Sequence, residues 1–338
     1  MSTHGTHPYR LYAHIGSPYS MKMRGILRYR GIPHIMKARI SDWTGAFQKV
    51  RVPVMPVLEY PEGTFHNDST PLILDLEQRH SDRSVIPTRE TDAFLAALIE
   101  DLADEWLSKA MYAYRWAFPE HTQWTGRLIA FDQRFGGGRT ASEEAGHAFE
   151  TRQVRRNELV GCTAANLPML MQIAERVLDA LEPNIPEQPF LFGTRPSNAE
   201  FALFGQLCQF TLDLAAIGPC QARAPYTMRW CHHLHDLSGH EGAWRTDDEP
   251  MSPAVGALLD LAGEAYLPFL VANQAALESG GGRVRIEAHG LGYEGAPYKY
   301  QRHCLTELRR AYGGLSLEAR DQLDPLLEAH QCLAPLQG

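Results

Sequence analysis

The chain has 338 residues, of which 44% are hydrophobic and 21% charged, and its formal net charge is −8 at pH 7. That length allows two or three domains with sizeable cores, and the negative balance, with no basic run against it, argues against general nucleic-acid binding. We see no run of about 18 apolar residues and no signal peptide in MSTHGTHPYR, so we expect no membrane span and no secretion. The six cysteines form no CxxC pair and suit reduced thiols in a cytoplasm.

The segment from Tyr9 to Gln78 carries the clearest local signals, after a loose leader at 1–8. Ser17 before Pro18 is an ideal helix cap, and Gly31 is an ideal helix stop. Pro61-Glu62-Gly63 between two apolar runs is typical of a hairpin turn. The predicted elements are, in order, a strand at 9–13, a helix after Pro18, a strand at 32–38, a hairpin of strands at 57–60 and 64–66, and a helix beginning at 68–71.

Most of the remaining chain shows helical periodicity. A polar linker at 80–87 precedes a long helix that Phe118-Pro119 ends. Ser197 with Glu200 forms a capping box before a helix that is apolar on nearly all sides. The further predicted elements are a glycine-rich break at 135–139, helices at 143–159, 167–181, 199–214, 224–237 and 253–277, a strand at 284–288, a turn at 290–297, a possible second strand from Tyr298 with a helix to Tyr312, and a helix at 317–329.

Four motifs in this order resemble the glutathione transferase superfamily. They are Ser17-Pro18-Tyr19-Ser20 after the first strand, Val54-Met55-Pro56-Val57-Leu58, Asp68-Ser69 opening a helix, and FLFGTRPSNAEFALF at 190–204. The resemblance implies an α/β thioredoxin-like domain of βαβ-ββα order at 1–82 and an all-helical domain at 88–245. Residues 246–338 lie outside the ordinary family pattern, and we expect them to add a helix, a β-hairpin and further helices.

Ser17 is the first candidate for chemistry. By itself it is simply a helix cap, but a helix N-terminus also gathers partial positive charge that favours an arriving thiolate. In the resembled family the residue after the first strand stabilises the thiolate of glutathione, which makes Ser17 the predicted catalytic residue. Ser20, Tyr12 and Tyr19 are the alternatives.

The same resemblance implies a glutathione site made of Ser17, Pro18, Tyr19, Met55, Pro56, Asp68 and Ser69. Met55-Pro56 would be a cis peptide whose outward backbone pairs with the cysteinyl part of glutathione, with Pro53 as the competing position. Asp68 and Ser69 would hold its γ-glutamyl end, although either residue is also an ordinary helix cap. Lys49, Arg51 and Arg39 are candidates for the glycine carboxylate.

A second, acceptor pocket is expected at Met111, Tyr112, Arg115 and Trp116, although an aromatic stripe is more often packing. Cys231 and His235 share a helix face, but the sequence supplies no second ligand group at zinc spacing, so we predict no metal.

The implied reaction is attack of a glutathione thiolate on an electrophilic small molecule. Glutathione would be a co-substrate, and the resemblance implies a homodimer. The alternatives are a non-catalytic glutathione-binding or protein-interaction module and another glutathione-dependent enzyme, namely an isomerase, dehalogenase or peroxidase.

Overall fold

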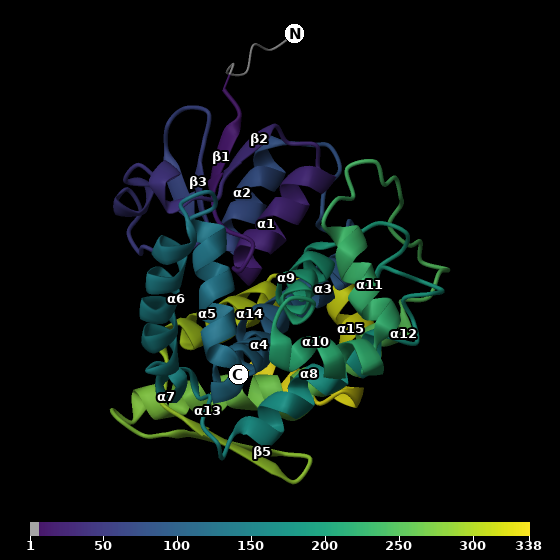
Figure 1. Cartoon of the computed structure of the whole chain (residues 1–338). Coiled ribbons are helices and arrows are strands. Elements are labelled where there is room, and N and C mark those ends of the chain that lie inside the picture. Colours follow the sequence, from purple (N-terminus) through teal and green to yellow (C-terminus); the bar gives the residue numbers. More distant parts are fainter. Residues whose placement is uncertain (1–6) are drawn as a thin grey trace.

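The computed structural model describes residues 7–338, so most of the leader expected at 1–8 lies outside the described residues (Figure 1). The first domain is built on a four-stranded sheet of order β2-β1-β3-β4, in which β1 and β2 are parallel and the other neighbours antiparallel. Its elements are β1 (Tyr9–Tyr12), α1 (Pro18–Tyr29), β2 (His34–Lys37), β3 (Val57–Glu59), β4 (Phe65–Asn67) and α2 (Ser69–Arg79). The predicted βαβ-ββα order is confirmed.

Local chemistry explains where α1 begins and ends. The Ser17 Oγ accepts a hydrogen bond from the Ser20 backbone N–H at 3.3 Å, and Pro18 occupies the first helical turn. Gly31 follows the helix with φ 63°, in the left-handed region that favours glycine. The predicted cap and stop are both confirmed.

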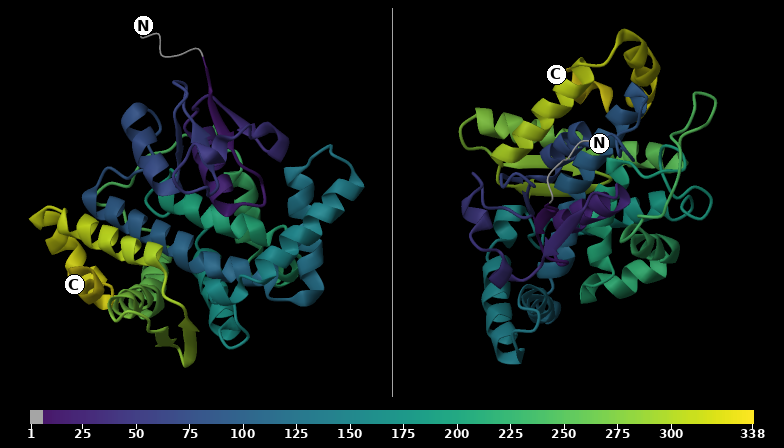
Figure 2. Two further views of the ribbon diagram at one scale, coloured as in Figure 1. Left: turned by 90° about the vertical axis from the view of Figure 1, so that its left-hand side faces the viewer. Right: turned by 90° about the horizontal axis from the view of Figure 1, so that it is seen from above.

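The second domain is helical. Its first rod, α3 (Glu90–Leu102), continues through a π-helical stretch (Ala103–Leu107) into α4 (Ser108–Trp116) and crosses the molecule beneath the first domain (Figure 2). The other helices are α5 (Pro119–Gln133), α6 (Arg139–Val154), α7 (Asn157–Val160), α8 (Leu167–Leu181), α9 (Asn198–Phe210), α10 (Leu214–Arg223) and α11 (Pro225–Leu234).

Helix α9 forms the core of the helical domain, and the first domain packs against it. Every residue of α9 is buried, and Ser197 with Glu200 forms the predicted capping box at its start. Helix α1 packs directly on α9. The approach is so close that a Cβ at Gly205 would lie 2.6 Å from the Pro18 carbonyl oxygen. The glycine therefore allows the close approach that fixes the Ser17–Pro18 turn on the core helix.

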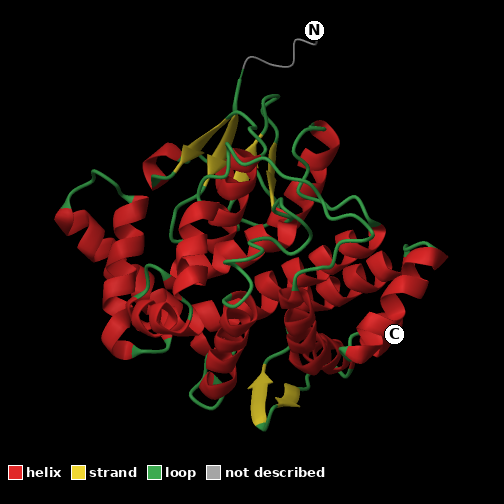
Figure 3. Ribbon diagram, turned by 90° about the vertical axis from the view of Figure 1, so that its right-hand side faces the viewer, coloured by secondary structure: helices red, strands yellow, loops and turns green. Residues whose placement is uncertain are grey.

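Residues beyond 245 form a third, tightly attached segment that we call the extension (246–338). It contains α12 (Pro253–Leu261), a π-helical stretch (Ala262–Tyr266), α13 (Leu267–Glu278), β5 (Val284–Ala288), β6 (Leu291–Gly295), α14 (Lys299–Gly313), α15 (Leu317–Ala329) and α16 (Leu333–Gln337). Figure 3 places the β5–β6 hairpin and the four-stranded sheet at opposite ends of a mostly helical molecule. The predicted helix, hairpin and helices are confirmed.

The second strand of that hairpin was predicted in the wrong place. His289 and Gly290 form a two-residue turn with φ 54° and 73°, so β6 begins at Leu291, and Tyr298 is the cap of helix α14. Three glycines at 290, 292 and 295 made the strand resemble a turn in the sequence.

One helix of the extension is both long and apolar, although Asp260 and Glu264 interrupt its run of apolar residues. The continuous helix Pro253–Glu278 has an 18-residue window with a mean hydropathy of 1.5, which is long and apolar enough to cross a membrane. In the fold, 67% of that window is buried inside the protein. Its apolar side chains therefore form the core of the extension.

Candidate functional site

One large cavity brings together most of the predicted site residues. It has a volume of about 1030 Å³ and lies between the first domain, α4, α5–α7 and the start of α14. Ser17, Pro18, Tyr19 and Met55 line one side. The predicted acceptor-pocket residues line the facing wall, and they are Met111, Tyr112, Arg115 and Trp116. The cavity therefore joins the two predicted subsites.

Ser17 is the hydroxyl best placed for chemistry in this cavity. Its Oγ accepts from Ser20, and its own proton has no acceptor among the described residues. The Tyr19 hydroxyl also borders the cavity, but it donates to the Asp104 carbonyl at 2.7 Å. Burial raises the pKa of Tyr19 well above its ordinary value, which keeps that hydroxyl protonated.

The other two alternatives lie away from the cavity. Ser20 lies within α1 and is fully buried, and its Oγ has no partner among the described residues. The Tyr12 hydroxyl donates to Glu59 at 2.6 Å. Ser17 thus faces the cavity with a free hydroxyl proton, whereas Ser20 and Tyr12 do not line it.

His14 borders the cavity beside Ser17 and was missed in the sequence. Burial, together with the nearby Arg115 charge, lowers the pKa of His14 to about 4, so the imidazole is neutral at pH 7. Its Nε2 lies 3.1 Å from the Gln133 amide nitrogen, and its Nδ1 has no partner among the described residues. A histidine just after the first strand carries no sequence signal that separates this position from ordinary core packing.

Arg115 lines the cavity, but its main role is to hold neighbouring elements together through hydrogen bonds. The residue is 5% exposed, and its guanidinium donates to Asp213 at 2.8 Å, to the Gly16 carbonyl at 2.8 Å and to the Gln209 side chain at 2.7 Å. These bonds tie the turn before Ser17 to α4 and α9. The residue predicted for the acceptor wall thereby also positions the predicted catalytic residue.

The Met55–Pro56 peptide is cis, as expected. Met55 lines the cavity, and its backbone N–H and C=O make no hydrogen bond with any other described residue. Pro56 is buried behind it, and Pro53 lines the cavity in its place. The Met55 backbone is therefore available to pair with an extended peptide.

Asp68 and Ser69 are not part of the cavity lining. Asp68 has φ 76° and ψ 117°, a strained conformation for a residue with a side chain, and its carboxylate accepts a hydrogen bond from the Tyr300 hydroxyl at 2.9 Å. The Ser69 side chain is buried and accepts from Lys22 Nζ at 3.3 Å. The structure thus places both residues in polar contacts within the chain.

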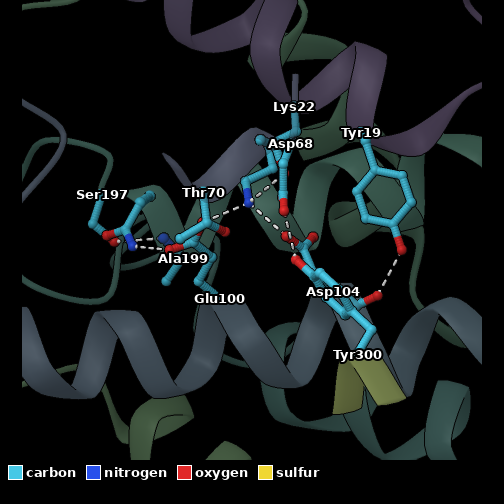
Figure 4. A network of polar contacts seen from close by, with 11 residues as sticks. Tyr19, Lys22, Asp68, Thr70, Glu100, Asp104, Ser197, Ala199 and Tyr300 are labelled. Atoms are coloured by element: carbon cyan, nitrogen blue, oxygen red, sulfur yellow. Dashed lines mark hydrogen bonds and ion pairs between the residues drawn. The ribbon is translucent and has the colours of Figure 1, made fainter. Parts of the chain in front are cut away.

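Lys22 is the centre of a buried network that the sequence did not reveal. Its ammonium is fully buried and lies 2.5 Å from Glu100 and 2.6 Å from Asp104 on the α3 rod (Figure 4). Burial lowers the pKa of Lys22, but the attraction of Asp104 and Glu100 outweighs it and leaves the pKa above its ordinary value. Lys22 therefore clamps α1 to the helical domain as a cation.

The extension supplies part of the cavity wall. Ala296, Tyr298 and Gln301 line it. The Asn273 side chain holds this segment from α13, because it donates to the Tyr298 carbonyl at 3.0 Å and accepts from the Tyr298 N–H at 2.7 Å. The predicted site is thus completed by residues outside the ordinary family pattern.

The cations proposed for a glycine carboxylate do not line the cavity. Arg39 pairs with Asp42 at 3.0 Å, Lys49 lies 4.0 Å above the Phe65 ring, and Arg51 is exposed. Within residues 7–338 there is no group of three or more His, Cys, Asp or Glu side chains that could hold a metal.

The fold and this cavity define a thioredoxin-like domain joined to a helical domain. Residues 11–84 match the family model of the glutathione S-transferase N-terminal domain. The N-terminal domain therefore belongs to the glutathione S-transferase superfamily, as the resemblance predicted, and residues beyond 84 lie outside the match.

More distant likenesses are found among solved structures, whereas no curated protein matches the chain. A glutathione S-transferase from Methylobacterium radiotolerans, solved with glutathione sulfonate, is 19% identical over 72% of this chain and 99% of that chain, with a TM-score of 0.42. A β-etherase from Sphingobium is 16% identical over 75% and 99%, with a TM-score of 0.47. A glutathione S-transferase from Methylobacillus flagellatus with glutathione bound is 17% identical over 66% and 93%, with a TM-score of 0.40.

Proposed function

We propose that the protein is a glutathione transferase that binds glutathione in the large cavity and activates its thiol at Ser17. The proposal depends on the Ser17 hydroxyl group, which lines the cavity at the N-terminus of α1. Its proton has no hydrogen-bond acceptor among the described residues. A hydroxyl donor and a helix N-terminus both stabilise a thiolate, so the bound thiol would ionise nearer neutral pH.

The remaining parts of glutathione would use the neighbouring backbone and the helix after β4. The free N–H and C=O of Met55 would pair with the cysteinyl residue, as one strand pairs with another. Asp68 and Ser69 would bind the γ-glutamyl end of glutathione. The Asp68 carboxylate would then either keep its hydrogen bond from the Tyr300 hydroxyl and bind glutathione as well, or lose that hydrogen bond. A carboxylate offers about four acceptor positions, so sharing is chemically allowed.

The reaction would be attack of the thiolate on an electrophile held against the α4 wall. The sulfur forms a bond to the electrophilic carbon, the leaving group departs with the bonding electron pair, and the thiol proton passes to solvent. The protein would contribute the lowered thiol pKa and the orientation of the two reactants.

The test is a calorimetric titration of glutathione into the wild type and Ser17→Gly, with the ultraviolet absorbance of the thiolate followed against pH. Glycine is a suitable replacement because as a helix cap it costs only a few tenths of a kcal/mol relative to serine. A hydrogen bond to a charged group is worth about 1.5–3 kcal/mol, which corresponds to about one to two pKa units. We expect both proteins to bind glutathione and only the wild type to lower the thiol pKa by that amount.

Ser20→Ala is the matched control, since it removes a hydroxyl from the buried side of the same helix turn. It should leave the thiol pKa unchanged. A wild type that binds no glutathione, or an equal thiol pKa in wild type and Ser17→Gly, would refute the proposal.

One observation favours the second candidate, a non-catalytic module with the same scaffold. Asp68 already has a partner in Tyr300, so the γ-glutamyl position is occupied within the chain. Glutathione binding without any transferase activity would support that reading.

We also propose that the protein resides in the cytoplasm, and six free, buried cysteines support a reducing compartment. A homodimer stays a prediction from the resemblance.

A further inference from the structure

The α4 wall of the cavity contains a buried cation without a counter-ion. Four lysine or arginine residues in the described chain are buried, and three of them form ion pairs. Lys22 pairs with Glu100 and Asp104, Arg30 with Glu77 at 2.8 Å, and Arg115 with Asp213 at 2.8 Å. The fourth, Lys109, is 9% exposed and has no carboxylate within 4.0 Å.

The surroundings of Lys109 leave much of its ammonium unsatisfied. Nζ donates one hydrogen bond, to the Val160 carbonyl at 3.2 Å, and lies 5.2 Å from the centre of the Phe269 ring and 5.6 Å from that of Tyr293. An ammonium has three donors, and a buried charge is costly unless it is paired. Both Lys109 and Val160 line the cavity, so a ligand there can supply the missing anion.

Glu105, one helical turn before Lys109, also lines the cavity. The two side chains form no ion pair within 4.0 Å. Burial raises the pKa of Glu105 well above its ordinary value, and the nearby Asp101 and Asp104 add to the rise, whereas the Lys109 charge opposes it. In its protonated form, the Glu105 carboxyl can donate a hydrogen bond to an anion beside Lys109.

The mouth of the cavity adds positive charge. Arg134, Arg152 and Arg156 line it, are exposed, and have no ion-pair partner among residues 7–338. A concave site lined by one sign of charge attracts ligands of the opposite sign. The chain as a whole has a net charge of −8, so the positive charge at this cavity is opposite in sign to that of the whole protein.

Aromatic rings line the same cavity. Tyr112 and Trp116 on α4 have ring centres 6.4 Å apart, and Phe149 on α6 lies 5.8 Å from Trp116. Lys109 and Arg115 are six residues apart, about 9 Å along the helix axis, and Arg115 holds the turn before Ser17. One cavity therefore contains a candidate anion site, aromatic rings and the predicted thiolate position.

We propose that the acceptor substrate is an aromatic carboxylate, bound by Lys109 through its carboxylate and by Tyr112, Trp116 and Phe149 through its ring. This inference rests on the proposed transferase function, since it names the electrophile of the same site. For an aryl chloride of this class, the glutathione sulfur bonds to the ring carbon that bears chlorine and chloride leaves with the bonding electron pair.

The test is equilibrium binding, without glutathione, of 3,5-dinitrobenzoate and of its neutral analogue 3,5-dinitrobenzamide. These two probes are unreactive, so the measurement does not depend on thiol activation. The wild type should bind the benzoate at least about tenfold more tightly than the amide, as a hydrogen bond to a charged group predicts. Equal binding of the two probes, or no binding of either, would overturn the proposal.

Lys109→Met removes the charge and keeps most of the aliphatic stem. It should weaken benzoate binding by at least about tenfold and change amide binding by less than about twofold. Lys37→Met, a lysine on β2 outside the cavity lining, is the matched control and should change neither. Unchanged benzoate binding in Lys109→Met would contradict the proposal, and the wild-type comparison of the two probes stands even if this variant does not fold.

Glu105→Gln distinguishes a neutral from an ionised Glu105. A neutral carboxyl replaced by a neutral amide should leave the benzoate preference within about twofold. A large gain in benzoate affinity would show that Glu105 had been an ion-pair partner of Lys109, and the premise of an unpaired cation would fall. Loss of glutathione binding, in contrast, bears on the proposed function and leaves these probe measurements intact.

Discussion

Lys22→Met is the substitution whose cost the structure defines best. The change keeps the size and apolar stem of a fully buried side chain and removes its ammonium. Glu100 would retain two hydrogen bonds, from Thr70 at 2.9 Å and from Asn198 at 2.5 Å. Asp104 would lose its Oδ2 partner, and its Oδ1 has none among the described residues. The cost therefore falls mainly on Asp104.

Removing one partner of a buried ion pair typically costs about 3–5 kcal/mol. Because Glu100 stays bonded and Asp104 can take up a proton, we expect the lower end, about 3 kcal/mol at pH 7. Urea unfolding, followed by circular dichroism, measures this as a lower midpoint at unchanged slope. Lys37→Met, a lysine that is not in the buried network, should lie within about 0.5 kcal/mol of the wild type.

The pH dependence gives an independent check on sign. In the wild type the pKa of Lys22 is raised above 10.5, so its stabilising contribution is full below that value and constant between about pH 5 and about pH 8. Burial raises the pKa of Asp104 even beside Lys22, and losing the cation would raise it further. A raised carboxyl pKa means stability that falls as pH rises, so the deficit of Lys22→Met should grow from about pH 5 to about pH 8.

A second substitution separates lost charge from lost packing. Lys22→Met with Asp104→Asn removes the carboxylate that Lys22→Met leaves without a partner, while Glu100 keeps its hydrogen bonds from Thr70 and Asn198. The double variant should be about 1–2 kcal/mol more stable than Lys22→Met alone. A single variant within about 0.5 kcal/mol of the wild type, or a double variant no better than the single, would refute the assignment of Lys22 as an interdomain clamp.

Two further predictions concern Tyr300 and Asp101. Tyr300→Phe removes the hydroxyl that occupies Asp68, so calorimetry should show glutathione binding about 2–10-fold more tightly, as expected for one lost competing hydrogen bond, and weaker binding would show that Tyr300 supports the site. Burial raises the pKa of Asp101 from 3.8 to about 7, and a folded-state pKa above the unfolded value gives stability that is full below about pH 4 and lost as pH rises to about 7. Asp101→Asn should remove this pH-dependent loss of unfolding free energy, which is at most about 4 kcal/mol. Urea unfolding measured from about pH 4 to about pH 7 tests this, and a variant with the same pH dependence as the wild type would contradict the prediction.

Local signals made many of the helix ends predictable. The cap at Ser17, the stop at Gly31 and the box at Ser197 and Glu200 each depend on residues within four positions of one another, and each forms as predicted. Long helices with clear periodicity were equally accessible, since α8 and α15 have the predicted bounds. Where glycines hid a strand, at β6, the prediction was wrong because turn residues and a glycine-rich strand share the same composition.

The candidate site was predictable only in the part that adjacent residues determine. Ser17, Met55 and the α4 residues meet in one cavity as expected, but the Asp68–Tyr300 contact joins residues 232 positions apart. A tyrosine at the start of a distant helix carries no mark of such a partner. Lys22 and Lys109 present the same difficulty, because a lysine in an amphipathic helix normally lies in solvent. Only the packed structure shows that one is paired and the other is not.

The extension contributes side chains both to the hydrophobic core around Trp106 and to the wall of the cavity. Trp106 on the α3 rod is fully buried, and its ring lies 4.7 Å from that of Phe269 and 5.5 Å from that of Tyr293, both in the extension. Tyr293 in turn fits against Gly161, where a Cβ would lie 2.0 Å from its hydroxyl oxygen. The same packing brings Tyr298 to the cavity wall and Tyr300 to Asp68. A chain without residues 246–338 would expose the Trp106 face and open the cavity on one side, so stability and ligand choice are linked through the same aromatic contacts.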